Sequence, residues 1–343
     1  MRRLISLLGV VSLLVSCAGR PDPGVVRTEV SVRKIWDKGT HAAFTSLEKF
    51  QGKYYCSFRE GYSHVFDEQG NAEGHVRILC SADGESWESV ADIGMAGVDL
   101  RDPKLSITPD GRLMVIIGGS VYRDRKLVEC RPQVCFSKDG KTFSPLEAVQ
   151  VDPAVRSDFD WLWRVTWHEG VGYAVTYRRE EGVLLLKTLD GIHFDPVSLL
   201  KNEGFMNEST VRFLPDGRMA VMVRRDPGTE TALLAVASAP FTQWTWHEMP
   251  LHVGGPDFLV RPDGSLIVGG RSQTNPSHCK TVLYKGTADG GLDERYVLPS
   301  DGDNSYPGLL VEGDELWVSY YSTDKVPGKA AIFLAKLPLK LFE

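Results

Sequence analysis

The segment Ser81-Ala82-Asp83-Gly84-Glu85-Ser86-Trp87 recurs along the chain in altered form. Two further copies keep its order of hydroxyl, acid, glycine and aromatic residues: Ser137-Lys138-Asp139-Gly140-Lys141-Thr142-Phe143 and Thr188-Leu189-Asp190-Gly191-Ile192-His193-Phe194. A degraded fourth copy is Thr287-Ala288-Asp289-Gly290. Acid and hydroxyl side chains at this spacing hydrogen-bond their own backbone and close a turn, while the aromatic residue packs between sheets. We therefore expect these acids to be structural rather than catalytic.

Six hairpin signals recur out of phase with these segments. Each centres on a glycine between two apolar or alternating runs, at positions 52, 111, 170, 217, 264 and 313. Glycine supplies the positive φ that tight hairpins require. The successive spacings of 59, 59, 47, 47 and 49 residues are the size of a propeller blade. The sequence therefore predicts an all-β fold: a six-bladed β-propeller of four-stranded antiparallel blades, forming a single domain over residues 30–343.

The same register predicts which side chains face the propeller axis. In each blade the first strand runs to the hairpin and the second returns, so the strand ends opposite the hairpins meet around one cavity. Seven residues after the six glycines stand Arg59, Gly118, Tyr177, Arg224, Arg271 and Tyr320. Seven to eleven residues before them stand, among others, His41, Arg101, Asp102, Asp160, Trp161, Glu208, Asp257, Asn304 and Tyr306. Three arginines in identical register indicate a functional cavity rather than an apolar plug.

The acidic turns resemble the Asp-box of the sialidase (neuraminidase) superfamily, S/T-x-D-x-G-x-x-W/F, with a one-residue contraction. The resemblance becomes residue-specific in the second half of the chain. There Asn207-Glu208-Ser209-Thr210 followed by Arg224 looks like the family's glutamate and clamp arginine, and Arg271 stands where the next clamp arginine belongs. The segment Asp303-Asn304-Ser305-Tyr306-Pro307-Gly308 is similar to the one that carries the family's tyrosine nucleophile.

This resemblance implies a sialidase-like propeller and a retaining mechanism. Tyr306 would attack the anomeric carbon and Glu208 would accept its proton, an exception to the usual pair of carboxylates. Arg224 and Arg271 would grip a substrate carboxylate through fork-like hydrogen bonds.

The first half of the chain departs from the family pattern. Sialidases carry an Arg-Ile-Pro segment in the first blade, and this chain has Thr40-His41-Ala42-Ala43-Phe44-Thr45 instead, which places His41 at the pocket. The glutamate that buttresses the missing arginine is not evident near residues 320–322 either. Arg59 is retained as a substrate-binding candidate. In the loop behind it we favour Asp67 as the general acid, with Glu60 and His64 as the next candidates.

Three further residues are candidates for contacts with the sugar. Asp102 matches a family position on the pocket rim and would bind a substrate hydroxyl, or else act as a pre-proline turn residue. Trp161 and Arg164, at the start of the third blade, would form a wall for a sugar ring. Packing in the core is an equal alternative for the tryptophan.

The N-terminus predicts export and lipid anchoring. Met1, Arg2 and Arg3 precede an apolar run over residues 4–15 that is too short to span a bilayer. The following Leu14-Val15-Ser16-Cys17 resembles the bacterial lipobox. We expect residues 1–17 to hold a signal peptide cleaved before Cys17, lipid modification of that cysteine, and a tether over 18–29. The protein would then be anchored to the outer membrane of a bacterial cell envelope, facing the periplasm or the surface, with no other membrane contact.

Composition excludes several functional classes. A formal net charge of -6 and a pI near 5.8 give no electrostatic support for nucleic-acid binding. The cysteines form no CxxC pair and no histidine cluster stands at metal-ligand spacing, so we predict no metal and no cofactor. We expect a monomer.

These patterns predict an exo-acting retaining glycoside hydrolase of the sialidase type. Its substrate would be a glycan ending in an acidic sugar, either sialic acid or a related ulosonic or uronic residue. One alternative is a non-catalytic glycan-binding propeller lipoprotein that has lost the acid. Another is a propeller lyase or rhamnosidase-like hydrolase that uses His41 or His64 as a base.

Overall fold

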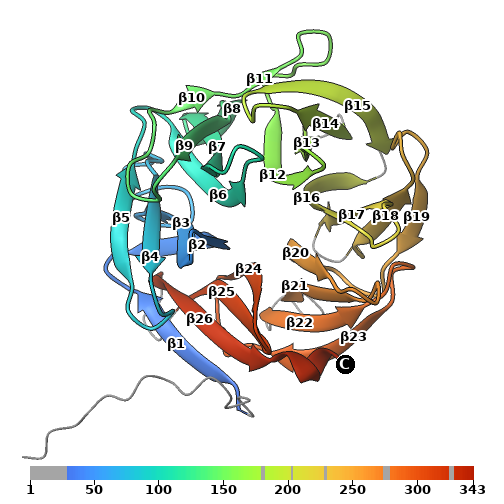
Figure 1. The fold of residues 1–343 in the computed structure, drawn as a ribbon. Coiled ribbons are helices and arrows are strands. Elements are labelled where there is room, and N and C mark those ends of the chain that lie inside the picture. The colour runs from blue at the N-terminus through green and yellow to red at the C-terminus, as the bar shows by residue number, and fades with distance from the viewer. Residues whose placement is uncertain (1–28, 179–181, 202–203, 228–229, 273–278, 324–327) are drawn as a thin grey trace, which may run out of the picture.

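The computed structural model describes residues 29–178, 182–201, 204–227, 230–272, 279–323 and 328–343. The signal peptide, Cys17 and the tether up to residue 28 lie outside the described residues. Within the described ranges the chain forms strands β1 to β26 and one 3-10 helix, η3 (Leu339–Phe342). Figure 1 shows the strands arranged in sheets around a central axis, so the prediction of an all-β propeller is confirmed. No helix among the described residues is long and apolar enough to cross a membrane.

Four of the five sheets come from successive stretches of the chain. The first contains β6 (Asp99–Ile107), β7 (Leu113–Arg123), β8 (Lys126–Cys130), β9 (Gln133–Ser137) and β10 (Glu147–Ala148). The second contains β11 (Gln150–Val151), β12 (Trp161–His168), β13 (Val171–Tyr177), β14 (Val183–Thr188) and β15 (His193–Lys201). The third contains β16 (Phe205–Phe213), β17 (Met219–Asp226), β18 (Leu233–Ala237) and β19 (Thr245–Glu248). The fourth contains β20 (Gly254–Val260), β21 (Leu266–Ser272), β22 (Lys280–Gly286) and β23 (Leu292–Val297).

The fifth sheet has eight strands and joins the two ends of the chain. Its N-terminal part is β2 (His41–Phe50), β3 (Lys53–Gly61), β4 (His75–Ser81) and β5 (Glu88–Ile93). Its C-terminal part is β24 (Asn304–Glu312), β25 (Glu315–Thr323), β26 (Ala330–Pro338) and β1 (Ser31–Trp36), which pairs antiparallel with β26. A single parallel residue pair, His41 with Ala330, connects the two parts. The β1–β26 pairing ties the first strand of the chain to the last and so closes the ring.

The hairpins and acidic turns form as the sequence predicts. All six hairpin glycines have positive φ, from +57° to +84°. In the first acidic turn, Asp83 Oδ1 accepts hydrogen bonds from the backbone N–H groups of Glu85 (2.8 Å) and Ser86 (2.9 Å). In the second, hydrogen bonds from the backbone N–H groups of Thr142 and Lys141 lower the pKa of Asp139 to about 2. These acids therefore stabilise turns and point away from the axis.

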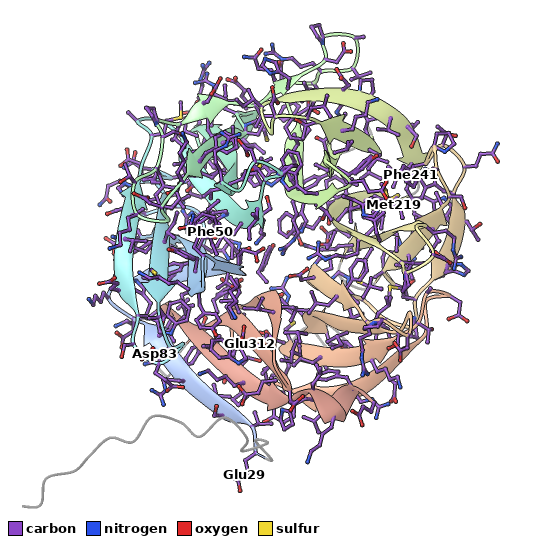
Figure 2. The ribbon with its side chains drawn as sticks, in the orientation of Figure 1. Glu29, Phe50, Asp83, Met219, Phe241 and Glu312 are labelled. Carbon is purple, nitrogen blue, oxygen red and sulfur yellow. The ribbon has the colours of Figure 1, made fainter. Side chains whose placement is uncertain are left out.

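Apolar side chains fill the spaces between neighbouring sheets. Met219 and Phe241, for example, are buried together with Val175 and Leu185 of the preceding sheet, and Figure 2 shows the first two far from the axis. Burying one such side chain contributes roughly 1.5–3 kcal/mol. The middle strands β7, β14 and β18 are therefore almost entirely buried, apart from the end of β7 and Lys187 of β14, whereas the outer strands β5, β19 and β23 are exposed or half-buried.

A β-bulge interrupts each of the six inner strands, β2, β6, β12, β16, β20 and β24. The register shifts lie between Ala43 and Ser46, Arg101 and Lys104, Leu162 and Val165, Met206 and Ser209, Gly254 and Asp257, and Ser305 and Gly308. A bulge bends the strand and redirects a side chain. Four of these bulges contain a residue with positive φ: Phe44, Asp102, Gly255 and Tyr306. The bulges therefore aim side chains from distant parts of the sequence at one point on the axis.

Candidate active site

The centre of the site is a hydrogen bond between Tyr306 on β24 and Glu208 on β16. The phenol donates to Glu208 Oε1 over 2.5 Å, although 98 residues separate the two in sequence. Both side chains lie in bulges and are more than nine-tenths buried. The structure thus brings together the two residues expected to form a nucleophile and base pair.

The surroundings of Glu208 keep its carboxylate ionised. Burial by itself raises the pKa, but the nearby Arg224 and the hydrogen bond from Tyr306 outweigh it and hold the pKa below its ordinary value. Arg224 Nη1 lies 2.7 Å from Glu208 Oε1, and the backbone N–H of Gly255 donates to Oε2 over 2.9 Å. Burial and the neighbouring Glu208 charge raise the pKa of Tyr306 well above its ordinary value. The pair therefore rests as a neutral phenol beside an anionic acceptor, the protonation states that base-assisted attack requires.

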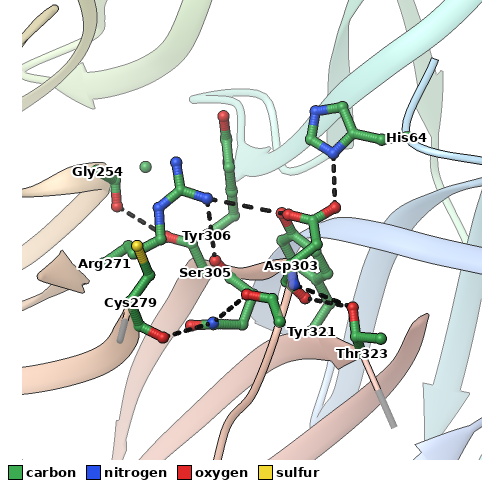
Figure 3. A network of polar contacts seen from close by, with 12 residues as sticks. His64, Gly254, Arg271, Cys279, Asp303, Ser305, Tyr306, Tyr321 and Thr323 are labelled. Atoms are coloured by element: carbon green, nitrogen blue, oxygen red, sulfur yellow. Dashed lines mark hydrogen bonds and ion pairs between the residues drawn. The ribbon is translucent and has the colours of Figure 1, made fainter. Parts of the chain in front are cut away.

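Both predicted clamp arginines point inward. Arg224 Nη2 contacts both carboxylate oxygens of Asp226 at 3.0 Å. Arg271 Nη1 lies 3.5 Å from the Asn304 carbonyl and 3.9 Å from Asp303 Oδ1 (Figure 3). The Nε atoms of both arginines are buried and have no hydrogen-bond partner among the described residues. Each guanidinium thus keeps donor capacity at the site.

A second cluster converges on Asp303, a residue that sequence reasoning did not single out. Its Oδ2 faces His64 Nδ1 at 2.6 Å (Figure 3). The same oxygen faces His41 Nε2 at 3.1 Å, and Oδ1 accepts the Tyr321 hydroxyl at 2.7 Å. Burial opposes ionisation of Asp303, but the hydrogen bonds from the two histidines prevail and hold its pKa well below the ordinary value. The one sequence signal for Asp303 was its position three residues before Tyr306.

His41, His64 and Asp303 also raise the question of a metal ion. Within the described ranges, these three residues offer ligand atoms within 4.8 Å of one another. However, His41 is buried, its pKa is lowered by that burial, and its Nδ1 has no hydrogen-bond partner in the described ranges. A metal on Nε2 would require a proton on Nδ1, leaving a buried N–H without an acceptor, whereas metal-bound histidines nearly always donate that proton. The cluster fits a hydrogen-bonded network better than a metal site.

The structure separates the three candidates for the general acid. Asp67, the favoured one, closes an exposed turn by accepting hydrogen bonds from the backbone and side-chain nitrogens of Asn71, which lower its pKa. Glu60 accepts from Arg77 Nε at 2.8 Å and from Trp36 Nε1 at 3.3 Å. The lowered pKa makes Asp67 a poor proton donor, and both oxygens of Glu60 are engaged by Arg77 and Trp36. Of the three, His64 alone contacts the Asp303 cluster in the described residues. The position of Asp67 therefore does not support the preference for it as the general acid.

Arg59, predicted to contact the substrate, is buried and held by protein partners. Its side chain is fully buried, with Nε 2.8 Å from Asp99 Oδ1 and Nη1 donating to the Ser63 carbonyl over 2.8 Å. Arg101 also bonds to Asp99 and donates to the His64 carbonyl over 2.9 Å. The two arginines therefore anchor the loop that carries His64. Arg59 lies on β3 opposite the bulge of β2, as its position in the sequence suggests, but its side chain is not exposed.

Asp102 is a buried acid with unused hydrogen-bonding capacity. Its side chain is 6% exposed, its φ is +50°, and its Oδ1 has no hydrogen-bond partner. Burial raises its pKa to about 6, although Arg101 and Lys104 act in the opposite direction. The charges of Asp102 and Glu208 influence each other, which places Asp102 near the central pair. Its strained backbone and unpaired oxygen are the features expected of a ligand contact.

Trp161 and Arg164 differ in position from the predicted sugar wall. Trp161 is 7% exposed and stacks on Tyr177 with a centroid separation of 6.0 Å, so packing accounts for it. Arg164 is buried against Asp257 and lines a cavity of about 500 Å³. That cavity is lined by the hairpin ends of the innermost strands, whereas Tyr306 and Glu208 lie toward their opposite ends. Arg164 therefore lines the cavity at the hairpin ends of the inner strands, away from the place predicted for the sugar wall.

Comparison with known proteins shows the fold. No family model and no curated protein matches the sequence. A protein of unknown function from Dyadobacter fermentans aligns with a TM-score of 0.75 and 18% identity, over 90% of this chain and 99% of its own. The α-L-arabinofuranosidase Arb93A of Fusarium graminearum gives 0.66 and 15%, over 90% and 98%. The sialidase of Trypanosoma rangeli gives 0.65 and 12%, over 87% of this chain and 55% of its own. The chain therefore has a sialidase-like β-propeller fold.

Proposed function

We propose that this protein is a retaining, exo-acting glycoside hydrolase in which Tyr306 is the nucleophile and Glu208 its base. The observation that carries the proposal is the 2.5 Å hydrogen bond from the phenol to a carboxylate that Arg224 keeps ionised. A non-catalytic glycan-binding propeller has no need for such a pair. Several structural neighbours of this chain, at 11–15% identity, are sialidases, an arabinofuranosidase and an arabinanase, which supports a glycosidase.

The proposed reaction proceeds in two balanced steps. In the first, the Tyr306 oxygen bonds to the anomeric carbon, its proton passes to Glu208, and the bond to the leaving oxygen breaks. His64 supplies the proton that the leaving oxygen takes. In the second step, water gives a proton to His64 and attacks the anomeric carbon, and the Tyr306 oxygen leaves and recovers its proton from Glu208.

His64 is the proton donor in this proposal because of how it is held. Its Nδ1 faces Asp303 at 2.6 Å, which fixes the ring and directs Nε2 away from the carboxylate. Its side chain is 46% exposed, so Nε2 is accessible to a substrate. The same imidazole would serve as base in a lyase, and the trapping experiment below separates the two, because a lyase forms no glycosyl–tyrosine bond.

The proposed substrate is a glycan ending in an acidic sugar, such as sialic acid or a related ulosonic or uronic residue. Arg224 and Arg271 would bind its carboxylate with their remaining donors, and Asp102 would bind a hydroxyl. A neutral phenol suits such a substrate because it avoids repulsion between an anionic nucleophile and the sugar carboxylate.

The decisive experiment is covalent trapping. The protein is incubated with 2,3-difluorosialic acid and with activated 2-fluoro derivatives of uronic and arabinofuranosyl sugars, and is then digested for mass spectrometry. We expect one glycosyl adduct on the peptide that contains Tyr306, and none in Tyr306→Phe. Tyr320→Phe is the matched control, because Tyr320 is also buried and, within the described part of the chain, its hydroxyl bonds to the Pro299 carbonyl rather than to a carboxylate. Turnover by Tyr306→Phe equal to wild type would disprove the proposal.

We also propose the finer features of architecture and location. The single residue pair between β2 and β26 supports counting the eight-stranded sheet as two blades, which makes six in all. The lipobox-like segment ending at Cys17 supports a lipoprotein on the outer membrane of a bacterial envelope, and we propose that it is a monomer. Metabolic labelling with an alkyne fatty acid would label wild type but not Cys17→Ser.

A further inference from the structure

Lys104 is a buried cation against the ring of Tyr306. Its side chain is 1% exposed, and its Nζ lies 5.5 Å from the centroid of the Tyr306 ring and 4.8 Å from that of Trp163. Two of its protons go to backbone carbonyls, those of Thr45 at 3.0 Å and Phe44 at 3.4 Å. An ammonium within about 6 Å of an aromatic face is attracted by the ring electrons, most strongly where water is excluded.

The backbone around Lys104 holds this arrangement in place. Lys104 follows the bulge of β6, which turns its side chain toward the axis. Thr45, which accepts one of its hydrogen bonds, donates through its own hydroxyl to the Tyr306 carbonyl over 2.7 Å. The ammonium and the phenol ring are thus positioned by one continuous set of hydrogen bonds. Chance packing of a lysine would not require two carbonyls to point at its nitrogen.

The charge matters because phenolate formation at this position is opposed by burial and by Glu208. Arg224 and Arg271 counteract that effect but are also assigned to the substrate carboxylate, which would neutralise part of their charge. Lys104 has no exposed surface and cannot be taken by a substrate. It is therefore a positive charge near Tyr306 that persists throughout the reaction.

We propose that Lys104 is a positioning residue that stabilises the developing phenolate of Tyr306 through the face of its ring. This inference rests on the proposed function, since it assigns Lys104 a part in forming and breaking the glycosyl–tyrosine bond. The stabilisation is greatest when the phenolate leaves in the second step. Removal of the charge therefore slows deglycosylation.

A dependence on pH accompanies this role. The charged groups that act on the Lys104 ammonium are Arg164, Asp102, Glu208 and Asp257. Burial, reinforced by Arg164, lowers the pKa of Lys104 to about 8 in spite of the three carboxylates. Lys104 is charged below that pH and neutral above it, so its contribution to the rate disappears as pH rises through about 8.

The first test needs no substrate. The protein is labelled with 3,5-difluorotyrosine, whose phenol is more acidic than that of tyrosine, and the 19F resonance of residue 306 is assigned with Tyr306→Phe. We expect its titration midpoint to rise in Lys104→Met and to return toward wild type in Lys104→Arg. The control is Lys336→Met, since Lys336 is also buried over an aromatic ring, that of Trp317 at 4.0 Å. An unchanged midpoint in Lys104→Met would overturn the inference, and Lys104→Gln replaces that variant if it does not fold.

The second test measures the reaction. With the fluorosugar that traps the wild type, reactivation of Lys104→Met should be roughly tenfold slower, corresponding to a cation–π contribution of the size seen at desolvated sites. The reactivation rate of the wild type should fall as pH rises through about 8, and this fall should be absent in Lys104→Met. If no sugar traps the wild type, the proposed function fails while the fluorotyrosine result still decides the electrostatic role. If the wild type is trapped and Lys104→Met reactivates equally fast, the inference alone fails.

Discussion

Replacing Asp102 by asparagine should make the protein more stable at neutral and alkaline pH. Burial raises the pKa of this carboxyl from 3.8 to about 6. Between those values the unfolded chain has lost a proton that the folded protein keeps, so folded-state stability falls as pH rises from about 4 to 6. A difference of roughly two pKa units corresponds to about 3 kcal/mol above pH 6. Asparagine removes the charge and tolerates the φ of +50°.

Equilibrium urea unfolding, followed by tryptophan fluorescence at pH 3.5, 6 and 8, measures this effect. We expect wild type and Asp102→Asn to be nearly equally stable at pH 3.5 and the variant to be more stable by about 3 kcal/mol at pH 8. Asp139→Asn is the control of opposite sign, because backbone hydrogen bonds lower the pKa of Asp139, and its charge therefore stabilises the fold above pH 4. A stability difference for Asp102→Asn that does not change with pH would refute the reasoning. A loss of turnover in the stabilised variant would show that the strained acid is kept for function.

Three further changes test the geometry of the site. Gly255→Ala should displace the nucleophile Tyr306 and reduce turnover by about a hundredfold or more. The reason is that an added Cβ would lie 2.9 Å from Tyr306 Cγ, on a residue whose φ is +60°. An unchanged kcat would contradict this close approach. Arg224→Met should raise the pKa of Glu208, moving the acid limb of the pH–rate profile to higher pH, since the main opposing charge to burial is lost; an unmoved limb would mean that another group titrates. Asp83→Ala should lower the midpoint of thermal unfolding without changing kcat, because its carboxylate closes a turn; a matching loss of kcat in the folded variant would argue against a structural role.

The fold was predictable because its signals are local and repeated. Hairpin glycines and acidic turns each depend on a few neighbouring residues, so their spacing along the chain carries over directly into the spacing of strands. The pairing of Tyr306 with Glu208 followed from the same register together with the resemblance to sialidases. However, residues at equivalent positions in the strands differ in their surroundings. Arg59 is buried and holds the loop that carries His64, and Arg164 lines the cavity at the hairpin ends of the inner strands.

The sequence by itself determined the all-β ring and which strand ends face the axis, since periodicity and turn chemistry act over short distances. Beyond the pair Tyr306 and Glu208, only the tertiary structure decided which of those residues meet. The bulges that turn Asp102 and Tyr306 inward have no sequence signature, and the grouping of His41 and His64 around Asp303 joins residues more than 200 positions apart. The burial and the charges around these side chains come from several inner strands at once. The protonation state of each acid therefore depends on the closed ring and not on one segment of the chain.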